Sequence, residues 1–544
     1  TDPNCVDVME RFYPRVKQDY LNFGVKEGSG EERAENARWE HLVDIANRNN
    51  DDRPIIAAEY AHCMGNALGN FKEYWDEFYA NKRLAGGFIW DWVDQAIGEK
   101  INNSKLKIKN YDNHEDSVSC RYHMGGDYGD KPNSGAFCIN GIVRADRELT
   151  PKFWEVRNVL SPVQFYRSGD KIMVVNHNAH VSLKGYKVAI KSYEYGVPTD
   201  SQTIVLGAIQ PGKESPIMKV PTTQTCDKPI DWRMNLSAIT PQGDTLTTQQ
   251  IAIEEDITGT LPLGAAISES SSTVGAAVSK PSKARQESTN RSSSPLQTMT
   301  LSCARAATDN DKGFGNWLAK EWRNDSIYNP QVIHLGTKQN PDGTQTDSTK
   351  YKFANGYILL TTKLTPSPLR TEGTDEVLAT FTCHGSLPPL PRLGLRFRIP
   401  ADYSHIEYYG RGPWDNYPDR KTSALVGRYF STVSEQYTHY PRPQDNGNHE
   451  DCSYVKLSTD NGQSITFKAS GSEPFSFSAL PYSVEDIQAA KHDYELKPSG
   501  YVDLHIDCAV LGLGNSSCGP GVLKKYSIDS TIPHTLKLRI SMSK

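Results

Sequence analysis

The hydrophobic pattern of this chain changes near residue 166, and that change limits the folds it can adopt. Residues 1–165 alternate short apolar runs with stretches of helical spacing, whereas the rest carries short alternating segments separated by turn signals. Apolar residues at helical spacing predict helices, and strict alternation predicts half-buried strands. Since 544 residues are too many for one ordinary core, we expect several domains and a mixed, mostly β fold.

The first part of the chain has the repeating pattern of a (β/α)8 barrel. Residues 53–60 (RPIIAAEY) suit a buried parallel strand, and residues 66–79 follow with helical spacing. Residues 86–93 (GGFIWDWV) suit a second buried strand, and Thr150, followed by proline, suits the N-cap of another helix. This order predicts a partial (β/α)8, or TIM, barrel over residues 1–165.

The rest of the chain predicts two further domains and a linker. Residues 166–258 suit an immunoglobulin-like β-sandwich. Ten serines lie between Ser268 and Ser294, and such a composition cannot bury a core, so residues 259–304 predict a linker or disorder. Residues 305–544 predict a large antiparallel β-sandwich. Its turn signals lie at residues 340–343, 410–413 and 460–462.

Composition and charge exclude several classes of partner. The chain has 60 Lys and Arg against 65 Asp and Glu, a net charge of -5 with both signs interspersed. The sequence has no basic stripe of the kind that binds nucleic acid. It also has no apolar run that approaches the ~18–20 residues needed to span a bilayer. The sequence starts without methionine or a signal-peptide pattern, so we expect it to begin inside a longer protein. The compartment, cytoplasm or periplasm, stays open.

Glu59 stands next to last in the predicted strand 53–60. Active sites of (β/α)8 barrels lie at the C-terminal ends of their strands, so this carboxylate is expected to face a site. Retaining glycosidases use one carboxylate as nucleophile and a second, ~5–5.5 Å away, as acid and then base. A buried glutamate paired with an arginine is the alternative, and position alone leaves both open.

Four ordered segments of the first part resemble motifs of the β-galactosidases of glycoside hydrolase family 2. They are residues 59–66 (EYAHCMGN), similar to the nucleophile motif EYAHxMGN, and residues 86–95 (GGFIWDWVDQ), 125–130 (GGDYGD) and 137–141 (FCING). The resemblance continues in residues 305–313 (RAATDNDKG) and 409–420 (YGRGPWDNYPDR), which look like that family's terminal sandwich. It covers most of the chain outside the serine-rich segment.

The resemblance implies roles for single residues, each of which taken alone would suit a core or loop position. Glu59 becomes the nucleophile, and His62 a donor to galactose hydroxyls. Trp90 would offer an apolar face to the sugar and exclude water from the anomeric centre. Tyr13, in the segment FYPRV, resembles the tyrosine that donates a hydrogen bond to the nucleophile.

The resemblance also implies two metal ions. Phe137, through its backbone carbonyl, and Asn140 match ligands of a sodium ion that touches the sugar, so Asn140 is a substrate-binding residue as well. Oxygen ligands suit such a hard cation. A magnesium ion is implied too, with its ligands upstream of this chain.

The acid/base glutamate of the family has no counterpart before Glu59. No segment resembles the Asn-Glu motif that carries it, and the upstream glutamates lie outside such a motif: Glu10, Glu27, Glu31, Glu32, Glu35 and Glu40. We therefore expect the acid/base to be absent from this chain. A fraction of a barrel has open edges, and lost acid assistance costs ~10²–10⁴ in rate, so we expect the isolated chain to be unstable and inactive.

Two segments depart from the family pattern. Residues 511–522 (LGLGNSSCGPGV) resemble a loop that carries a sugar-stacking tryptophan in some relatives, but here Cys518 or its neighbour stands in that place. The linkage and aglycone therefore stay open. The serine-rich segment falls where the family places the first strands of its terminal sandwich, and a frameshifted or misread stretch over residues 259–305 is the alternative to a genuine linker.

The resemblance implies a retaining exo-β-galactosidase that hydrolyses terminal, non-reducing β-D-galactose residues through a covalent glycosyl-enzyme on Glu59. Its partner would be a β-galactoside, and homo-oligomers are common among such enzymes. One alternative is a family-two enzyme for another sugar, such as a β-glucuronidase, which would need a basic pocket for the uronate. The other is a non-catalytic, carbohydrate-binding β-sandwich protein.

Overall fold

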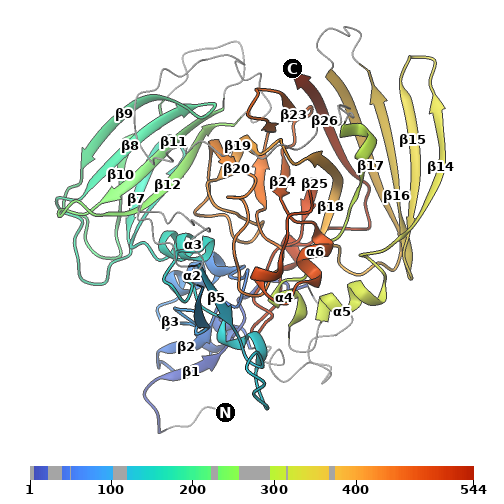
Figure 1. Cartoon of the computed structure of the whole chain (residues 1–544). Coiled ribbons are helices and arrows are strands. Elements are labelled where there is room, and N and C mark those ends of the chain that lie inside the picture. Colours follow the sequence, from blue (N-terminus) through green and yellow to red (C-terminus); the bar gives the residue numbers. More distant parts are fainter. Residues whose placement is uncertain are drawn as a thin grey trace.

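The computed structural model describes residues 5–21, 40–48, 51–101, 119–221, 231–255, 295–313, 317–366 and 374–543. Its elements form three groups: a small parallel sheet with helices, drawn in blue and teal, a sandwich in green, and a large sandwich from yellow to red (Figure 1). The fold is mixed and mostly β, which confirms the predicted class. In the part of the chain that is described, no helix is long and apolar enough to cross a membrane.

The blue group is part of a (β/α)8 barrel. Its parallel strands lie in chain order: β1 (Met9–Phe12), β2 (Ile55–Tyr60) and β3 (Leu84–Ile89). Its helices are α1 (Leu42–Ala46), α2 (Phe71–Ala80) and α3 (Pro151–Val159). Parallel neighbours in chain order with a helix between β2 and β3 are the arrangement that this fold requires. A hairpin of β4 (Ile97–Ile101) and β5 (Ser119–His123) and the 3₁₀ turn η1 (Gly135–Cys138) complete the group.

The helix predicted over residues 66–79 begins later than expected. Leu68 has φ +76° and Asn70 has φ +58°, so the chain turns there before α2 starts at Phe71. Residues in the left-handed conformation cannot continue a right-handed helix. The helical spacing of apolar residues in the sequence does not reveal such a conformation. The side chains of Phe71, Tyr74 and Phe78 form the buried face.

The second strand is displaced and exposed, so its prediction as a buried strand over residues 86–93 was wrong. β3 ends at Ile89, and the side chains of Phe88 and Trp92 are 67% and 54% exposed. β3 is an edge strand among the described residues, so one side of it has no neighbour. Thr150 does stand at the N-cap of α3, but its hydroxyl donates to the Ile142 carbonyl (2.5 Å) and leaves the helix uncapped.

The green group is a seven-stranded antiparallel sandwich among the described residues, in agreement with the predicted immunoglobulin-like fold. Its sheets have the orders β10-β7-β6 and β12-β11-β8-β9. The strands are β6 (Val163–Ser168), β7 (Lys171–Asn176), β8 (Lys187–Glu194), β9 (Val197–Val205), β10 (Glu214–Lys219), β11 (Trp232–Ile239) and β12 (Thr245–Glu254). Buried Val174 of one sheet and Ile190 and Leu236 of the other share one apolar core.

The largest group is a sandwich of a nine-stranded and a five-stranded sheet. The first contains, in order, β14 (Gln331–Gln339), β15 (Gln345–Lys352), β16 (Gly356–Thr365), β17 (Thr374–Gly385), β26 (His534–Ser543), β23 (Ser464–Ala469), β22 (Tyr454–Ser458), β19 (His405–Gly412) and β20 (Leu425–Thr432). The second contains β13 (Thr300–Ser302), β18 (Arg392–Pro400), β25 (Tyr501–Val510), β24 (Phe475–Leu480) and β21 (His449–Cys452). Phe397 and Phe467 meet between the sheets, with ring centroids 4.9 Å apart.

Short helices close the ends of this sandwich. They are α4 (Asp309–Lys312), α5 (Trp317–Asn324) and α6 (Val484–Ala489), with the 3₁₀ turns η2 (Pro295–Thr298), η3 (Asp493–Glu495) and η4 (Lys524–Tyr526). Strand β13 pairs with β18 inside the segment for which a linker was predicted. Residues 259–294 of that segment lie outside the described residues.

Two of the three predicted turns join strands, and the third does not. Residues 340–343 connect β14 to β15, and residues 460–462 connect β22 to β23. Residues 410–412 instead form the end of β19, where Gly410 pairs with Gly427. A Cβ on Gly410 would lie 2.2 Å from Cys452 Sγ, so this glycine allows a close approach of two strands rather than a turn.

Candidate active site

Strand β2 brings Glu59 to the carboxyl end of the parallel sheet. The backbone of Glu59 pairs with Phe12 of β1, and its carbonyl accepts a hydrogen bond from the Tyr13 N–H (2.7 Å). The backbone then bends, because Ala61 adopts a left-handed conformation (φ +49°) directly after β2. The ends of β1 and β2 therefore carry their side chains to one place.

Tyr13 lies beside Glu59 and is almost completely buried. Its phenol hydrogen bonds with the Glu59 carboxylate and with the Cys518 thiol. Burial, followed by the charges of Cys518 and Glu59, raises the pKa of Tyr13 far above its usual range. The phenol therefore stays protonated and donates to the carboxylate. The structure thus brings together the two residues that were predicted as nucleophile and partner.

His62 is buried three residues after Glu59. Its Nδ1 lies 2.7 Å from Ser517 Oγ, and its ring packs edge-on against Tyr13, with centroids 6.0 Å apart. The Phe137 ring lies on another side, at 5.9 Å. Burial lowers the pKa of His62 to about 4, so the imidazole is neutral at neutral pH. Because Ser517 engages Nδ1, the other ring nitrogen is the one suited to a ligand.

Trp90 directly follows β3 and is 41% exposed. Its N–H donates to the Tyr60 carbonyl (3.2 Å), and its own carbonyl accepts from the Cys63 N–H (2.7 Å). These backbone bonds fix Trp90 beside the segment that carries Glu59 and His62. An exposed indole at the carboxyl end of the sheet can offer its face to a ligand.

A hydrogen bond joins Asn140 to Phe137, and the side-chain oxygen of Asn140 has no hydrogen-bond partner. Asn140 Nδ2 donates to the Phe137 carbonyl (2.9 Å), while the buried Asn140 Oδ1 accepts no hydrogen bond. A carbonyl oxygen has two lone pairs, so one accepted hydrogen bond does not by itself prevent it from binding a cation. Two neighbouring oxygens fit the predicted sodium ion. Among the described residues, no three His, Cys, Asp or Glu side chains are arranged to hold a metal.

Lys152 is a further residue of the site, and sequence reasoning missed it. Its ammonium is buried and donates to the carbonyls of Cys63 (2.8 Å), Gly65 (2.8 Å) and Gly141 (2.7 Å). It thereby ties the segment after Glu59 to the segment of Asn140. Burial lowers the pKa of Lys152. A lysine early in a helix is typical of a surface position, so the sequence carried no signal for this role.

The segment of residues 511–522, here named the terminal loop, reaches the site from the large sandwich. Asp419 anchors it by accepting from the N–H groups of Leu513 (2.9 Å) and Gly514 (2.8 Å). It supplies Ser517 to His62 and Cys518 to Tyr13. The resemblance had placed Cys518 or its neighbour in a ligand-contacting loop, but it had not indicated the contact of Ser517 with His62.

Two family models match the chain. The model described as "Glycosyl hydrolases family 2, TIM barrel domain" matches residues 5–165, and the model described as "Beta galactosidase small chain" matches residues 274–540. The first covers the parallel sheet with Glu59, and the second covers the large sandwich with the terminal loop.

Curated relatives with the name β-galactosidase align with most of the chain. Those from Actinobacillus pleuropneumoniae, Priestia megaterium and Streptococcus thermophilus are 26%, 28% and 28% identical over 88%, 86% and 90% of this chain. The alignments cover 46%, 45% and 48% of those proteins, so the chain spans about half their length.

Solved structures are similar only at a low level. A family GH36 α-galactosidase from Geobacillus stearothermophilus is 9% identical, with a TM-score of 0.23, over 39% of this chain and 28% of that one. Such a score carries no argument about fold or function. The two family models, which together match most of the chain, agree with the predicted motifs, and the chain therefore belongs to glycosyl hydrolase family 2.

Proposed function

We propose that this chain is the part of a retaining β-galactosidase that carries the nucleophile, Glu59, and that the enzyme releases terminal, non-reducing β-D-galactose from β-galactosides. The observation that carries the proposal is the pairing of Glu59 with a buried, protonated Tyr13 at the carboxyl end of β2. The names of the curated relatives support galactose as the sugar.

In the proposed mechanism, a Glu59 oxygen attacks the anomeric carbon while the bond from that carbon to the aglycone oxygen breaks. The aglycone leaves with a proton from a second carboxylate, and a glycosyl ester forms on Glu59. Water then attacks the same carbon and loses a proton to the second carboxylate, the ester bond breaks, and galactose leaves with its configuration retained. Tyr13 donates to Glu59 and stabilises the carboxylate when it departs in the second step.

The other residues of the site would bind the sugar. Neutral His62, oriented by Ser517, would hydrogen bond to its hydroxyls, and Trp90 would cover its apolar face. The Phe137 carbonyl and Asn140 Oδ1 would hold sodium, which supplies a positive charge for a sugar hydroxyl. A magnesium ion stays part of the proposal, with ligands outside this chain.

The acid step has no assigned residue here, because the matched motifs contain the nucleophile and not the acid/base glutamate. Departure of a poor leaving group without acid assistance is slower by ~10²–10⁴. We therefore expect that the isolated chain does not hydrolyse lactose. Functional experiments then require the chain extended upstream to the length of its relatives.

Azide rescue tests the role of Glu59 in that extended protein. Glu59→Ala is expected to lower the turnover of 2,4-dinitrophenyl β-D-galactoside by about 10⁴-fold or more. Azide then takes the place of the missing carboxylate and attacks the anomeric carbon, so the product is α-galactosyl azide. The matched control is Glu10→Gln, at an exposed position of β1, and this variant is expected to keep full activity.

The product decides between the alternatives. A β-galactosyl azide would make Glu59 the acid/base instead of the nucleophile. Rescue seen only with a β-glucuronide would keep the mechanism and replace the sugar. Binding of galactosides without turnover in the folded wild-type protein would favour a non-catalytic carbohydrate-binding protein.

A further inference from the structure

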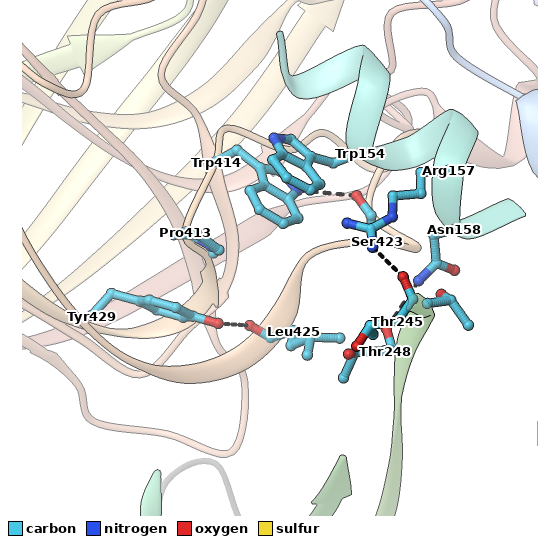
Figure 2. A pocket seen from close by; sticks show the side chains of 12 residues that line it. Trp154, Arg157, Asn158, Thr245, Thr248, Pro413, Trp414, Ser423, Leu425 and Tyr429 are labelled. Atoms are coloured by element: carbon cyan, nitrogen blue, oxygen red, sulfur yellow. Dashed lines mark hydrogen bonds between the residues drawn. The ribbon is translucent and has the colours of Figure 1, made fainter. Parts of the chain in front are cut away.

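A pocket lies where the three groups of elements meet. It is lined by α3 of the barrel part, by β12 of the smaller sandwich, and by the segment between β19 and β20 of the large sandwich, and its volume is about 150 Å³ (Figure 2). None of its lining residues belongs to the site around Glu59. The pocket is therefore a separate feature of the surface.

Two tryptophans form one wall of the pocket. Trp154 of α3 and Trp414 of the β19–β20 segment stack with centroids 4.6 Å apart and ring planes at 7°. Both are half-buried, and Trp414 Nε1 donates to Ser423 Oγ (3.0 Å), which fixes its ring. The Arg157 guanidinium lies over the Trp154 ring, 5.6 Å from its centroid, so the outer face of Trp414 is the apolar platform on which the C–H face of a sugar ring can pack.

Two buried polar side chains line the same pocket without hydrogen-bond partners. Asn158 is 5% exposed, and its Nδ2 donates to the Thr248 carbonyl (3.0 Å), while its Oδ1 accepts no bond. Thr247 is 3% exposed, and its hydroxyl makes no bond at all. An unsatisfied buried polar group costs ~1–3 kcal/mol, so both atoms favour a ligand that completes their bonds.

These groups define the chemistry of the ligand. Asn158 Oδ1 needs a donor, which disfavours an anion, and the exposed Arg157 guanidinium on the same rim disfavours a cation. Hydroxyl groups both donate and accept, and so satisfy Asn158 and Thr247 together. A cavity of roughly 150 Å³ holds a benzene ring in another protein, and a pyranose is larger because it also carries hydroxyl groups.

We propose that this pocket is a second carbohydrate site, which binds one neutral pyranose ring by stacking on the outer face of Trp414 and by hydroxyl bonds to Asn158 Oδ1 and Thr247 Oγ1. It is built where three parts of the fold meet, so a bound sugar contacts all three. The proposal does not depend on the reaction proposed at Glu59.

Calorimetric titration of the full chain with methyl β-D-galactopyranoside and methyl β-D-glucopyranoside tests the proposal, after circular dichroism has established that each variant is folded. Saturable binding is expected for at least one of them. Thr247→Val removes the hydroxyl without breaking any protein bond, and is expected to weaken binding by about 2- to 10-fold. Trp414→Leu is expected to weaken it by about 10-fold.

The matched control is Thr459→Val. Thr459 also has a buried hydroxyl without a partner, but it follows β22 and lies outside the pocket. Its replacement is expected to leave the affinity unchanged. Absence of saturable binding, equal affinities for Thr247→Val, Trp414→Leu and wild type, or preferential binding of inorganic phosphate would each overturn the proposal.

Discussion

The ammonium group of Lys152 is buried and contacts the segment that follows the candidate nucleophile. Three carbonyls, from two separate segments, depend on its ammonium for their hydrogen bonds. Its desolvation is offset only while all three bonds are made. The residue therefore positions the backbone that follows Glu59 and does not itself meet a substrate.

Replacement of Lys152 tests this positioning role. Lys152→Met is expected to lower the free energy of unfolding by about 3–5 kcal/mol, because it leaves buried carbonyls without partners. Urea denaturation followed by circular dichroism measures the change. The control is Lys72→Met, whose exposed ammonium pairs with Asp76 and is expected to contribute ~0.5 kcal/mol or less. A loss below about 1 kcal/mol for Lys152→Met would contradict the account.

Because His449 of β21 is buried, we expect the free energy of unfolding to depend on pH. Burial lowers its pKa to about 4, whereas an unfolded histidine titrates near 6.5. Between these values the unfolded chain binds one more proton than the folded one, so stability rises with pH across this window. The contribution of His449 is complete above about 6.5 and is lost, by about 3 kcal/mol, as the pH falls to about 4.

Denaturation curves at a series of pH values between 4 and 7 check this prediction. The slope of stability against pH is expected to be smaller for His449→Gln than for wild type, whatever the variant's stability at pH 7. Other buried groups titrate in both proteins, and the difference between the two slopes removes their contribution. Equal slopes would show that His449 is not held neutral by the fold.

At the scale of elements, Arg420 joins the barrel part to the large sandwich. Its guanidinium donates to Asn66 Oδ1 (2.7 Å) and the Ala67 carbonyl (2.8 Å) on one side and to Asp415 (2.9 Å) on the other. Arg420→Lys is expected to cost about 3 kcal/mol of stability, since an ammonium cannot reproduce this planar set of bonds. Thermal denaturation measures the loss, and exposed Arg398→Lys provides the comparison.

The terminal loop links the large sandwich to catalysis. In the extended protein, Ser517→Ala is expected to lower kcat/KM by about 2- to 10-fold, because His62 loses the bond that orients its ring. The matched control is Ser516→Ala. The Ser516 hydroxyl donates to the Asn310 carbonyl (2.7 Å) and does not contact His62. Equal kinetic constants for both variants and wild type would remove Ser517 from the site.

Strands and turns could be predicted where they depend on a local pattern of the sequence. The strand of Glu59, the strands of both sandwiches and the turns at residues 340–343 and 460–462 follow from alternation and turn residues. The start of α2 depended on the left-handed conformation of Leu68 and Asn70, which tertiary contacts impose. The exposure of Phe88 depended on the neighbours of β3 in the sheet, which no local pattern encodes.

At the scale of the whole molecule, the candidate site combines segments that are far apart in the sequence. Glu59, Tyr13, His62 and Asn140 could be proposed because they lie in motifs that resemble a known family. The contact of Ser517 with His62 could not, because the two residues lie 455 positions apart and no local pattern links them. Such contacts arise only when the large sandwich packs against the barrel part.

The most direct test of the account is covalent labelling of the extended protein with 2,4-dinitrophenyl 2-deoxy-2-fluoro-β-D-galactoside, followed by peptide mass spectrometry. The fluorine slows hydrolysis of the glycosyl-enzyme, and the leaving group departs without acid assistance, so a retaining nucleophile stays labelled. The account predicts a fluorogalactosyl adduct on Glu59. An adduct on another carboxylate, or a folded protein that takes up no label, would contradict it.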